Sequence, residues 1–190
     1  MGSNLTFKGS GELDNGWTFD VTVANLNGSA YSAANIDLGM GGLGSINFNQ
    51  GNSGNGIDAF DDKMPTAWEE PWGAGLSTGI KLVSGVGPSA NVQYTTPTIL
   101  GITLTAAVAP VMGHTDTADK ASSGGGTTKG KGLDGTININ PSFGTEILSG
   151  LNIFGGAHYT ETMKESDAFD TNIYEAVAGF TYDLGPVSIG

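Results

Sequence analysis

Cysteine and arginine are both absent from this 190-residue chain, and charge is scarce. Without cysteine, neither a disulfide framework nor a thiolate metal site can form. Charged residues make up 14% of the chain, against about 25% in typical soluble domains. The charge is also one-sided, with 7 lysines facing 19 acidic residues and a formal net charge of −12. Because a nucleic-acid partner requires a basic stripe, none is expected.

Long apolar runs are missing as well. No stretch of 18 apolar residues occurs, so no transmembrane helix is expected. Transmembrane strands give a much weaker sequence signal, and they are not excluded by this absence. No secretory signal peptide is recognisable at the start. Since Gly190 falls partway along an apparent strand, we expect the chain to be a piece of a longer protein.

Motifs for catalysis are lacking too. The chain has no G-x-S-x-G elbow and no Ser/His/Asp order, and His114 and His158 have no companion at metal-ligand spacing. The glycine-rich 122–126 stretch precedes no helix and reads as a loop tip. We therefore expect no enzymatic activity.

Two-residue alternation of apolar and polar side chains dominates what is present. Leu5 and Phe7 alternate with Thr6 and Lys8, and Asp14-Asn15-Gly16 then has the chemistry of a tight hairpin turn. This period is the strongest available indication of strands. The same alternation recurs at 17–23, 35–40, 45–49, 91–95, 102–105, 136–140, 151–160, 174–182 and 187–189. The sequence predicts about ten antiparallel strands in a single all-β domain.

The connections between these segments alternate in length. Short or moderate ones are expected at 14–16, 41–43, 96–100, 141–148 and 183–186. Longer, more polar ones are expected at 25–32, 50–87, 111–131 and 161–170. Short turns at one rim and long loops at the other are typical of a transmembrane β-barrel. A soluble β-sandwich is the alternative.

The polar face of the strands is mostly Asn, Thr, Ser and Gln, as suits a narrow water-filled lumen. Its few charges are Lys8, Asp20, Asp37 and Glu175, of which we assign Lys8, Asp20 and Asp37 to the pore lining. Aromatic residues near strand ends fit interface girdles; they are Trp17, Tyr94, Tyr159, Tyr174 and Tyr182.

The stretch at about 50–72 is too long for a turn and too acidic for a strand. Loops longer than about 12–15 residues are usually functional or disordered, and the aromatic and proline residues here favour a folded loop. We expect it to fold into a pore and narrow it. The proposed constriction residues are Asp58, Asp61, Asp62, Lys63, Glu69 and Glu70. A solvated acidic surface loop is the plainer alternative.

Several segments resemble a known family, the trimeric general porins of Gram-negative bacteria, particularly those of alphaproteobacteria. They are GSGELDNGWTF, GMGGLGSINF leading into IDAFDDKMPTAWEEPW, NVQYTTPTILGITLTAAV and FTYDLGPVSIG. The resemblance implies a 16-stranded antiparallel barrel, of which this chain would supply about ten strands, and a homotrimer. It also implies that the 50–72 loop is the inward-folded third extracellular loop. The chain departs from the family in having neither an arginine cluster nor a C-terminal aromatic residue.

The functional expectation is an outer-membrane pore for passive diffusion of small hydrophilic solutes and ions, with a preference for cations. Its partners would be outer-membrane lipid and lipopolysaccharide, and no cofactor would be required. Calcium is an alternative occupant of the loop, because it takes six to eight oxygen ligands. Its ligands would be Asp58, Asp61, Asp62, Glu69 and Glu70. The competing expectation is a soluble secreted β-sandwich for adhesion or carbohydrate binding.

Overall fold

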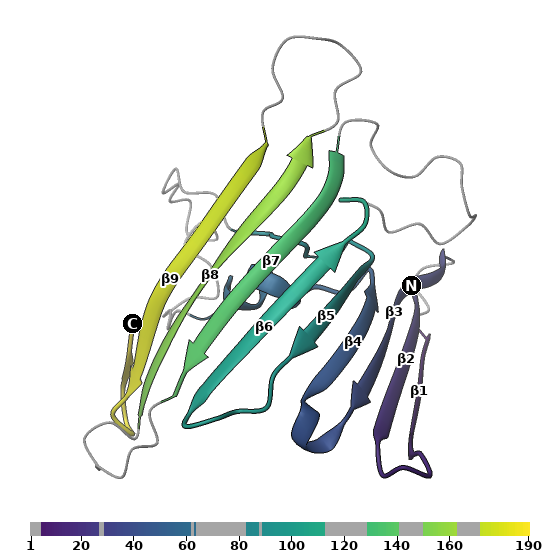
Figure 1. The fold of residues 1–190 in the computed structure, drawn as a ribbon, viewed down its shortest axis with the longest axis horizontal. Helices are drawn as coiled ribbons and strands as arrows, with labels where there is room; N and C mark the ends of the chain where they lie inside the picture. Colours follow the sequence, from purple (N-terminus) through teal and green to yellow (C-terminus); the bar gives the residue numbers. More distant parts are fainter. Residues whose placement is uncertain are drawn as a thin grey trace.

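Ten antiparallel strands form one continuous sheet in the computed structural model (Figure 1). The structure describes residues 5–26, 29–61, 63, 83–87, 89–112, 129–140, 150–162 and 172–190. The strands are β1 (Leu5–Glu12), β2 (Thr18–Leu26), β3 (Ser29–Gly39), β4 (Ser45–Gln50), β5 (Asn91–Thr95), β6 (Ile102–Ala109), β7 (Lys129–Ile139), β8 (Leu151–Thr162), β9 (Ile173–Asp183) and β10 (Ser188–Ile189). The predicted all-β class and the number of strands are confirmed.

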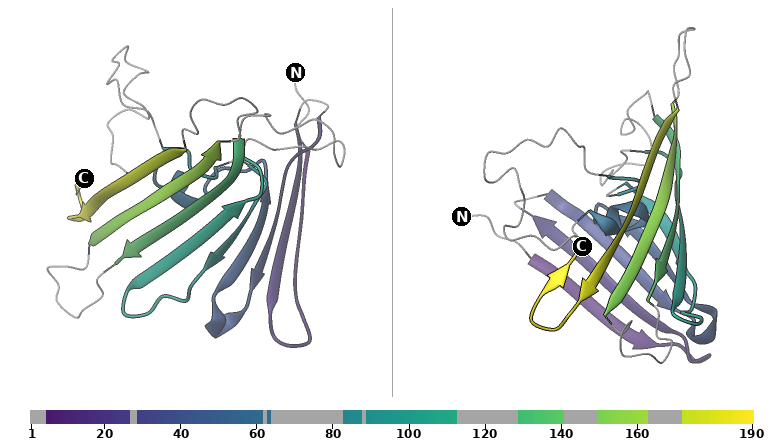
Figure 2. Two further views of the ribbon diagram at one scale, coloured as in Figure 1. Left: turned by 45° about the horizontal axis from the view of Figure 1, so that its top comes forward. Right: turned by 90° about the vertical axis from the view of Figure 1, so that its left-hand side faces the viewer.

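The sheet is a simple meander. Each strand pairs with its neighbours in the sequence, in the order β1 to β10 without a crossover. Among the described residues, β1 pairs only with β2 and β10 only with β9, so the sheet is open at both edges. Figure 2 shows that it is strongly curved, with β1–β3 turned out of the plane of β7–β9. The curvature gives the sheet a concave and a convex side.

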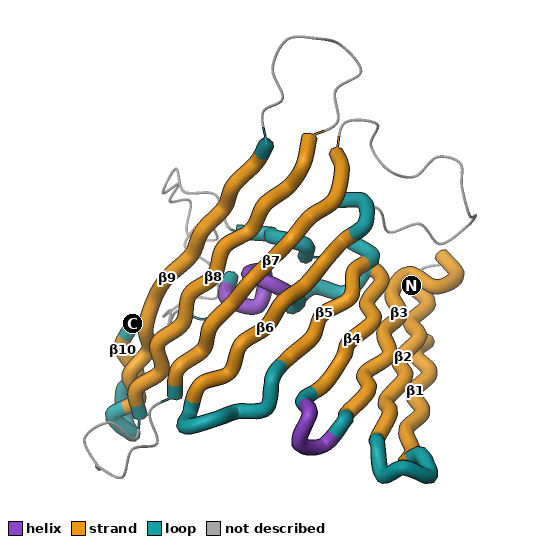
Figure 3. The backbone as a smooth tube through the Cα atoms, in the orientation of Figure 1, coloured by secondary structure: helices purple, strands orange, loops and turns teal. Residues whose placement is uncertain are grey.

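Helix is almost absent from the described part of the chain. Two short 3-10 helices occur, η1 (Gly41–Leu43) in the β3–β4 turn and η2 (Gly56–Phe60) in the β4–β5 connection (Figure 3). Over the described residues, no helix is long and apolar enough to cross a membrane. The β1–β2 turn has the predicted chemistry: Gly16 has a φ of 80°, and the Trp17 N–H donates to Asn15 Oδ1 over 3.0 Å.

One predicted connection is wrong. The sequence predicts a longer loop at 25–32, but β2 continues to Leu26 and β3 already begins at Ser29. Leu26 pairs with Ser29, after a register shift between Ala24 and Leu26. The first residues of β3, SAYSAA, have no regular alternation of apolar and polar residues, so the sequence does not indicate that the strand begins at Ser29.

The two faces of the sheet reverse the arrangement of a soluble protein. The convex face carries large apolar side chains that stay exposed, including Phe7 at 61%, Phe48 at 47% and Tyr174 at 73%. The concave face carries polar side chains, several of them buried, such as Asp134 at 6% and His158 at 4%. What buries them is the connection between β4 and β5, since η2 lies on the concave side against β6–β9 (Figures 1 and 2).

The small hydrophobic core lies between that connection and the sheet. Ile57 and Val86 come from the connection and are fully buried. Their partners on the sheet side are small or inward-facing, including Ala107, Ala109 and Phe154. Among the described residues, the fully buried side chains therefore lie where one loop attaches to the concave wall.

Candidate functional site

One transverse row of side chains crosses the concave face. The strand registers place its members opposite one another in turn, from β1 to β9. The row consists of Ser10, Asp20, Asp37, Asn47, Gln93, Ala107, Asp134, His158 and Glu175. Residues two apart on a strand share a face and paired residues share a level, so the meander itself creates this polar belt. The inserted β4–β5 loop is attached to it.

Asp134 on β7 binds both limbs of the β4–β5 loop, the outgoing one at Ile57 and the returning one at Val86. Its Oδ2 atom accepts the backbone N–H of Ile57 over 2.9 Å and that of Val86 over 3.1 Å. Its Oδ1 atom accepts from Nδ1 of His158, whose Nε2 bonds the Thr160 hydroxyl. The Asp134 and His158 side chains are 0% and 2% exposed. Every oxygen of this buried carboxylate thus has a partner, as a buried charge requires.

Glycine makes the close approach to Asp134 feasible. Gly56 and Gly85, which precede the two N–H donors, have φ values of 63° and 49°. A Cβ atom on either one would overlap Asp134 Oδ2. Glycine adopts this left-handed conformation without steric cost, so both limbs can turn their N–H groups onto the same oxygen.

Two further wall residues fasten the loop at either side of Asp134. Glu175 Oε2 accepts from the N–H groups of Ser84 (3.3 Å) and Gly85 (2.9 Å). Gln93 Oε1 accepts the N–H of Gly56 over 2.7 Å. The belt thereby supplies side-chain acceptors to a loop segment that has few backbone partners of its own.

Asparagine side chains extend the attachment toward β3 and β4. Asn55 Nδ2 donates to Asn47 Oδ1 (2.8 Å) and to Asn91 Oδ1 (2.7 Å). Asn47 Nδ2 donates in turn to Asp37 Oδ1 over 2.6 Å, and Asn35 Nδ2 donates to the other Asp37 oxygen over 2.7 Å. Asp37 is therefore part of the loop's support as well as of the wall.

Apolar packing completes the seat of the loop. The Phe60 ring stacks on that of Phe154, with centroids 4.8 Å apart. Ile57 lies over Gly156, where an added Cβ would come within 2.7 Å of the isoleucine side chain. The sheet surface beneath the loop is therefore formed by the inward-facing ring of Phe154 and by Gly156, whose lack of a side chain leaves room for Ile57.

The proposed constriction residues fall into three groups. Asp58 is buried, and its Oδ2 accepts the Gly54 N–H over 2.6 Å, so this carboxylate stabilises the loop's own turn. Asp61 and Lys63 are exposed and lie beyond the end of η2, where they can face solvent. Asp62, Glu69 and Glu70 lie outside the described residues.

Of the wall residues assigned to the pore lining, Lys8 and Asp20 are exposed on the concave face, on β1 and β2. Asp37 lies directly opposite Asp20 in the β2–β3 pairing. Within the ranges that the structure describes, no group of three or more His, Asp or Glu side chains is placed to hold a metal ion. Three of the five carboxylates named for calcium are outside those ranges.

Sequence reasoning missed most of the anchors. Asp134 was not singled out, His158 was read as a lone polar histidine, and Phe154 was overlooked. A partial signal existed, because Asp134 and His158 both alternate with apolar neighbours and so share the polar face. Their contact depends on the β7–β8 register, which alternation alone does not give.

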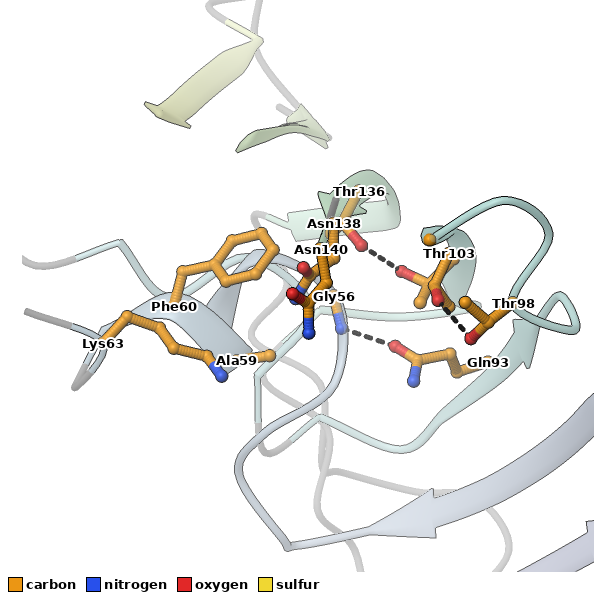
Figure 4. A pocket seen from close by; sticks show the side chains of 12 residues that line it. Gly56, Ala59, Phe60, Lys63, Gln93, Thr98, Thr103, Thr136, Asn138 and Asn140 are labelled. Atoms are coloured by element: carbon orange, nitrogen blue, oxygen red, sulfur yellow. Dashed lines mark hydrogen bonds between the residues drawn. The ribbon is translucent and has the colours of Figure 1, made fainter. Parts of the chain in front are cut away.

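A cavity of about 350 Å³ lies beside the loop, on the side of the β5–β6 turn. Figure 4 shows Gly56, Phe60 and Lys63 of the loop on one side and Gln93, Thr98 and Thr103 on the other. No carboxylate of the described residues lines it. The site as a whole is thus a polar concave wall, a loop anchored across it, and a pocket beside the loop.

Comparison with models of known protein families and with curated protein sequences finds no match to this chain. The geometry itself defines the class: a curved antiparallel sheet with an apolar exposed convex face and a polar concave face spanned by an inserted loop.

Proposed function

We propose that this chain forms the wall and constriction of a water-filled outer-membrane pore for small hydrophilic solutes and ions. The observation that carries the proposal is the reversed polarity of the two faces. Exposed apolar side chains cover the convex side, while acids, amides and hydroxyls lie on the concave side. Transmembrane barrels have this polarity, with an apolar outside and a polar lumen.

The exposed apolar face counts against a soluble β-sandwich. Soluble monomers rarely expose contiguous apolar patches above a few hundred Å², and a sandwich buries such a face against a second sheet. Here the described strands form one sheet, and the loop covers its polar side instead. Lipid tails are the environment that suits an uncovered surface of Phe, Leu, Ile and Val.

The aromatic residues on the convex face fit the two interfaces of such a membrane. Tyr94 and Tyr182 lie at the short-turn ends of β5 and β9, and Tyr94 Oη donates to the Leu43 carbonyl over 2.7 Å. Tyr159 and Tyr174 pair near the opposite rim, with ring centroids 5.3 Å apart. Amphipathic rings at both rims are the arrangement expected of headgroup girdles.

The open edges fit a barrel with further strands. Unpaired backbone groups cannot face lipid without a cost of several kcal/mol each, so β1 and β10 must both be paired in a membrane. The resemblance to trimeric general porins supplies the form: 16 strands per barrel, three barrels per particle. We place the subunit interface on the convex face of the early strands, roughly 5–48, where large apolar residues alternate with glycine and alanine.

The inserted loop would then set the width of the pore. It is held at the level of the transverse belt by Asp134, Glu175 and Gln93. A loop fixed across the lumen by side chains from β5, β7 and β9 is a built constriction. Solutes would pass between it and the remaining wall, where Lys8 and Asp20 are exposed.

The experiment that tests this function is conductance in planar lipid bilayers with the detergent-purified protein. Discrete, ohmic current steps are expected, together with a requirement for detergent and a heat-modifiable mobility in SDS gels. Cross-linking or light scattering in mild detergent is expected to give three subunits. A protein that stays monodisperse without detergent and gives no current steps would overturn the proposal in favour of the soluble alternative.

A further inference from the structure

The cavity beside the loop is lined mostly by uncharged polar side chains. Its residues are hydroxyl- and amide-bearing side chains, three small loop or turn positions, one phenyl ring and one lysine. They are Gly56, Ala59, Phe60, Lys63, Gln93, Thr98, Gly101, Thr103, Thr105, Thr136, Asn138 and Asn140. The volume of about 350 Å³ lies at the lower end of the range of about 300–1,000 Å³ for small-molecule sites.

The hydrogen-bonding groups of the lining are only partly used. Thr98 bonds Thr103 over 2.7 Å, and Thr105 bonds Thr136. In each pair one hydroxyl donates to the other, which leaves the second O–H free to donate. No hydrogen bond joins the side chain of Asn138 or Asn140 to another described residue, and both side chains line the cavity (Figure 4). Two amides and two hydroxyls can therefore donate to and accept from a ligand.

The charges around the cavity select against ionic ligands. Among the described residues of the lining, Lys63 is the one that carries a charge, so a cation would be repelled there and would meet no carboxylate of these residues. Asp61, two residues before Lys63 on the loop, is exposed, and its carboxylate repels anions. An uncharged ligand meets neither barrier.

We propose that this cavity is a binding subsite for a neutral, polyhydroxylated solute of monosaccharide size on its way through the pore. The paired amides of Asn138 and Asn140 would bind vicinal hydroxyls, which both donate and accept. The Lys63 ammonium would donate to a third oxygen, and Phe60 would border the less polar side. The inference rests on the proposed pore function and names the class of solute that the pore retains.

The test compares a hexose with a polyethylene glycol of equal hydrodynamic size. Both block the pore sterically, but the glycol has almost no O–H donors. Glucose is expected to produce additional current noise that saturates with concentration, whereas the glycol produces a proportional decrease only. In N138A/N140A the half-saturating concentration of glucose is expected to rise about tenfold, as loss of one or two hydrogen bonds to a ligand implies. N152A is the matched control, since Asn152 is an asparagine on the neighbouring strand that does not line the cavity.

Saturation-transfer NMR of the same protein in detergent measures glucose binding independently of conductance. Glucose signals that vanish in N138A/N140A and persist in N152A would support the subsite. Equal responses to glucose and glycol, or equal effects of the two sets of variants, would overturn it while leaving the pore intact. Absence of current steps would overturn the pore function itself, and absence of the NMR signal would overturn the subsite.

Discussion

Asp134 anchors the acidic loop from the wall, as a carboxylate of β7 that lies outside the loop itself. Because both loop limbs donate to its Oδ2 atom, Asp134→Ala leaves two buried N–H groups without an acceptor, at about 1–3 kcal/mol each. We expect the loop to detach from the wall while the sheet remains paired. Trypsin should then cut after the exposed Lys63 much faster than in the parent protein.

The control for this change lies in the same transverse row. Asp20→Ala also removes a concave-face carboxylate, but Asp20 is exposed and lies on β2, five strands away from Asp134 on β7. Its digestion rate should stay that of the parent protein. Equal acceleration in the two variants would mean that Asp134 does not hold the loop.

At the residue scale, sequence reasoning found exposed carboxylates more readily than structural ones. Asp58 and Asp61 look alike in the stretch IDAFDDK, yet Asp58 is buried and bonds Gly54 while Asp61 is exposed. What separates them is their position in the short 3-10 helix η2, since Asp58 lies within it and Asp61 directly follows its last residue. A helix of that length has no period of its own, so the sequence could not indicate which side chain turns inward.

Within the loop seat, Phe154 is the side chain with the largest expected effect. It is 3% exposed and stacks on Phe60, so Phe154→Ala should create a cavity that costs about 3–5 kcal/mol. The loss should appear locally, as faster hydrogen exchange of the Ile57 amide that bonds Asp134.

Ile153, the next residue, provides the comparison. It faces the convex side and is 41% exposed, so Ile153→Ala in detergent should leave the Ile57 exchange rate nearly unchanged. Similar acceleration by both variants would place Phe154 on the wrong face of β8.

At the element scale, period-two alternation was a good guide to the strands and a poor one to their ends. β5 begins and ends where the alternation does, at Asn91 and Thr95. β3 begins several residues earlier than predicted, because the sequence of its first half, SAYSAA, has no regular alternation of apolar and polar residues. Backbone pairing continues wherever a neighbouring strand offers partners, whatever the side chains show.

For the whole molecule, the proposed barrel predicts which positions meet water. Because the chain has no native cysteine, thiol labelling of a single introduced cysteine has no background signal from the chain itself. In lipid vesicles, cysteine at Thr22 should react with a membrane-impermeant thiol reagent, and cysteine at Phe7 or Phe19 should not. Labelling of the Phe7 and Phe19 variants with Thr22 protected would reverse the proposed faces.

Ion selectivity is the second property of the whole pore. On the pore lining and the exposed part of the loop, the carboxylates of Asp20, Asp37 and Asp61 outnumber the ammonium groups of Lys8 and Lys63. A narrow polar channel concentrates the resulting negative electrostatic field. We expect cation preference at about 0.1 M salt, where the Debye length is roughly 10 Å, and a weaker preference at 1 M, where it is about 3 Å.

Reversal potentials across a salt gradient, with a chelator present to remove calcium, measure this preference. Neutralising Asp61, Asp62, Glu69 and Glu70 together should reduce it. Asp58→Asn should affect it less, because that side chain is buried. An anion-selective parent pore would contradict the assignment of the loop's charge to the constriction.

The distance along the chain between the loop and its anchor has a consequence for the order of assembly. Asp134 lies 77 residues after Ile57, so the contact requires β7 to have joined the sheet. Contacts of such large sequence separation form late, since the intervening chain must first be ordered. A nascent wall would thus have a wide aperture that becomes narrow only once β7 and β8 are in place. A chain that stalls before that step would be leaky rather than blocked.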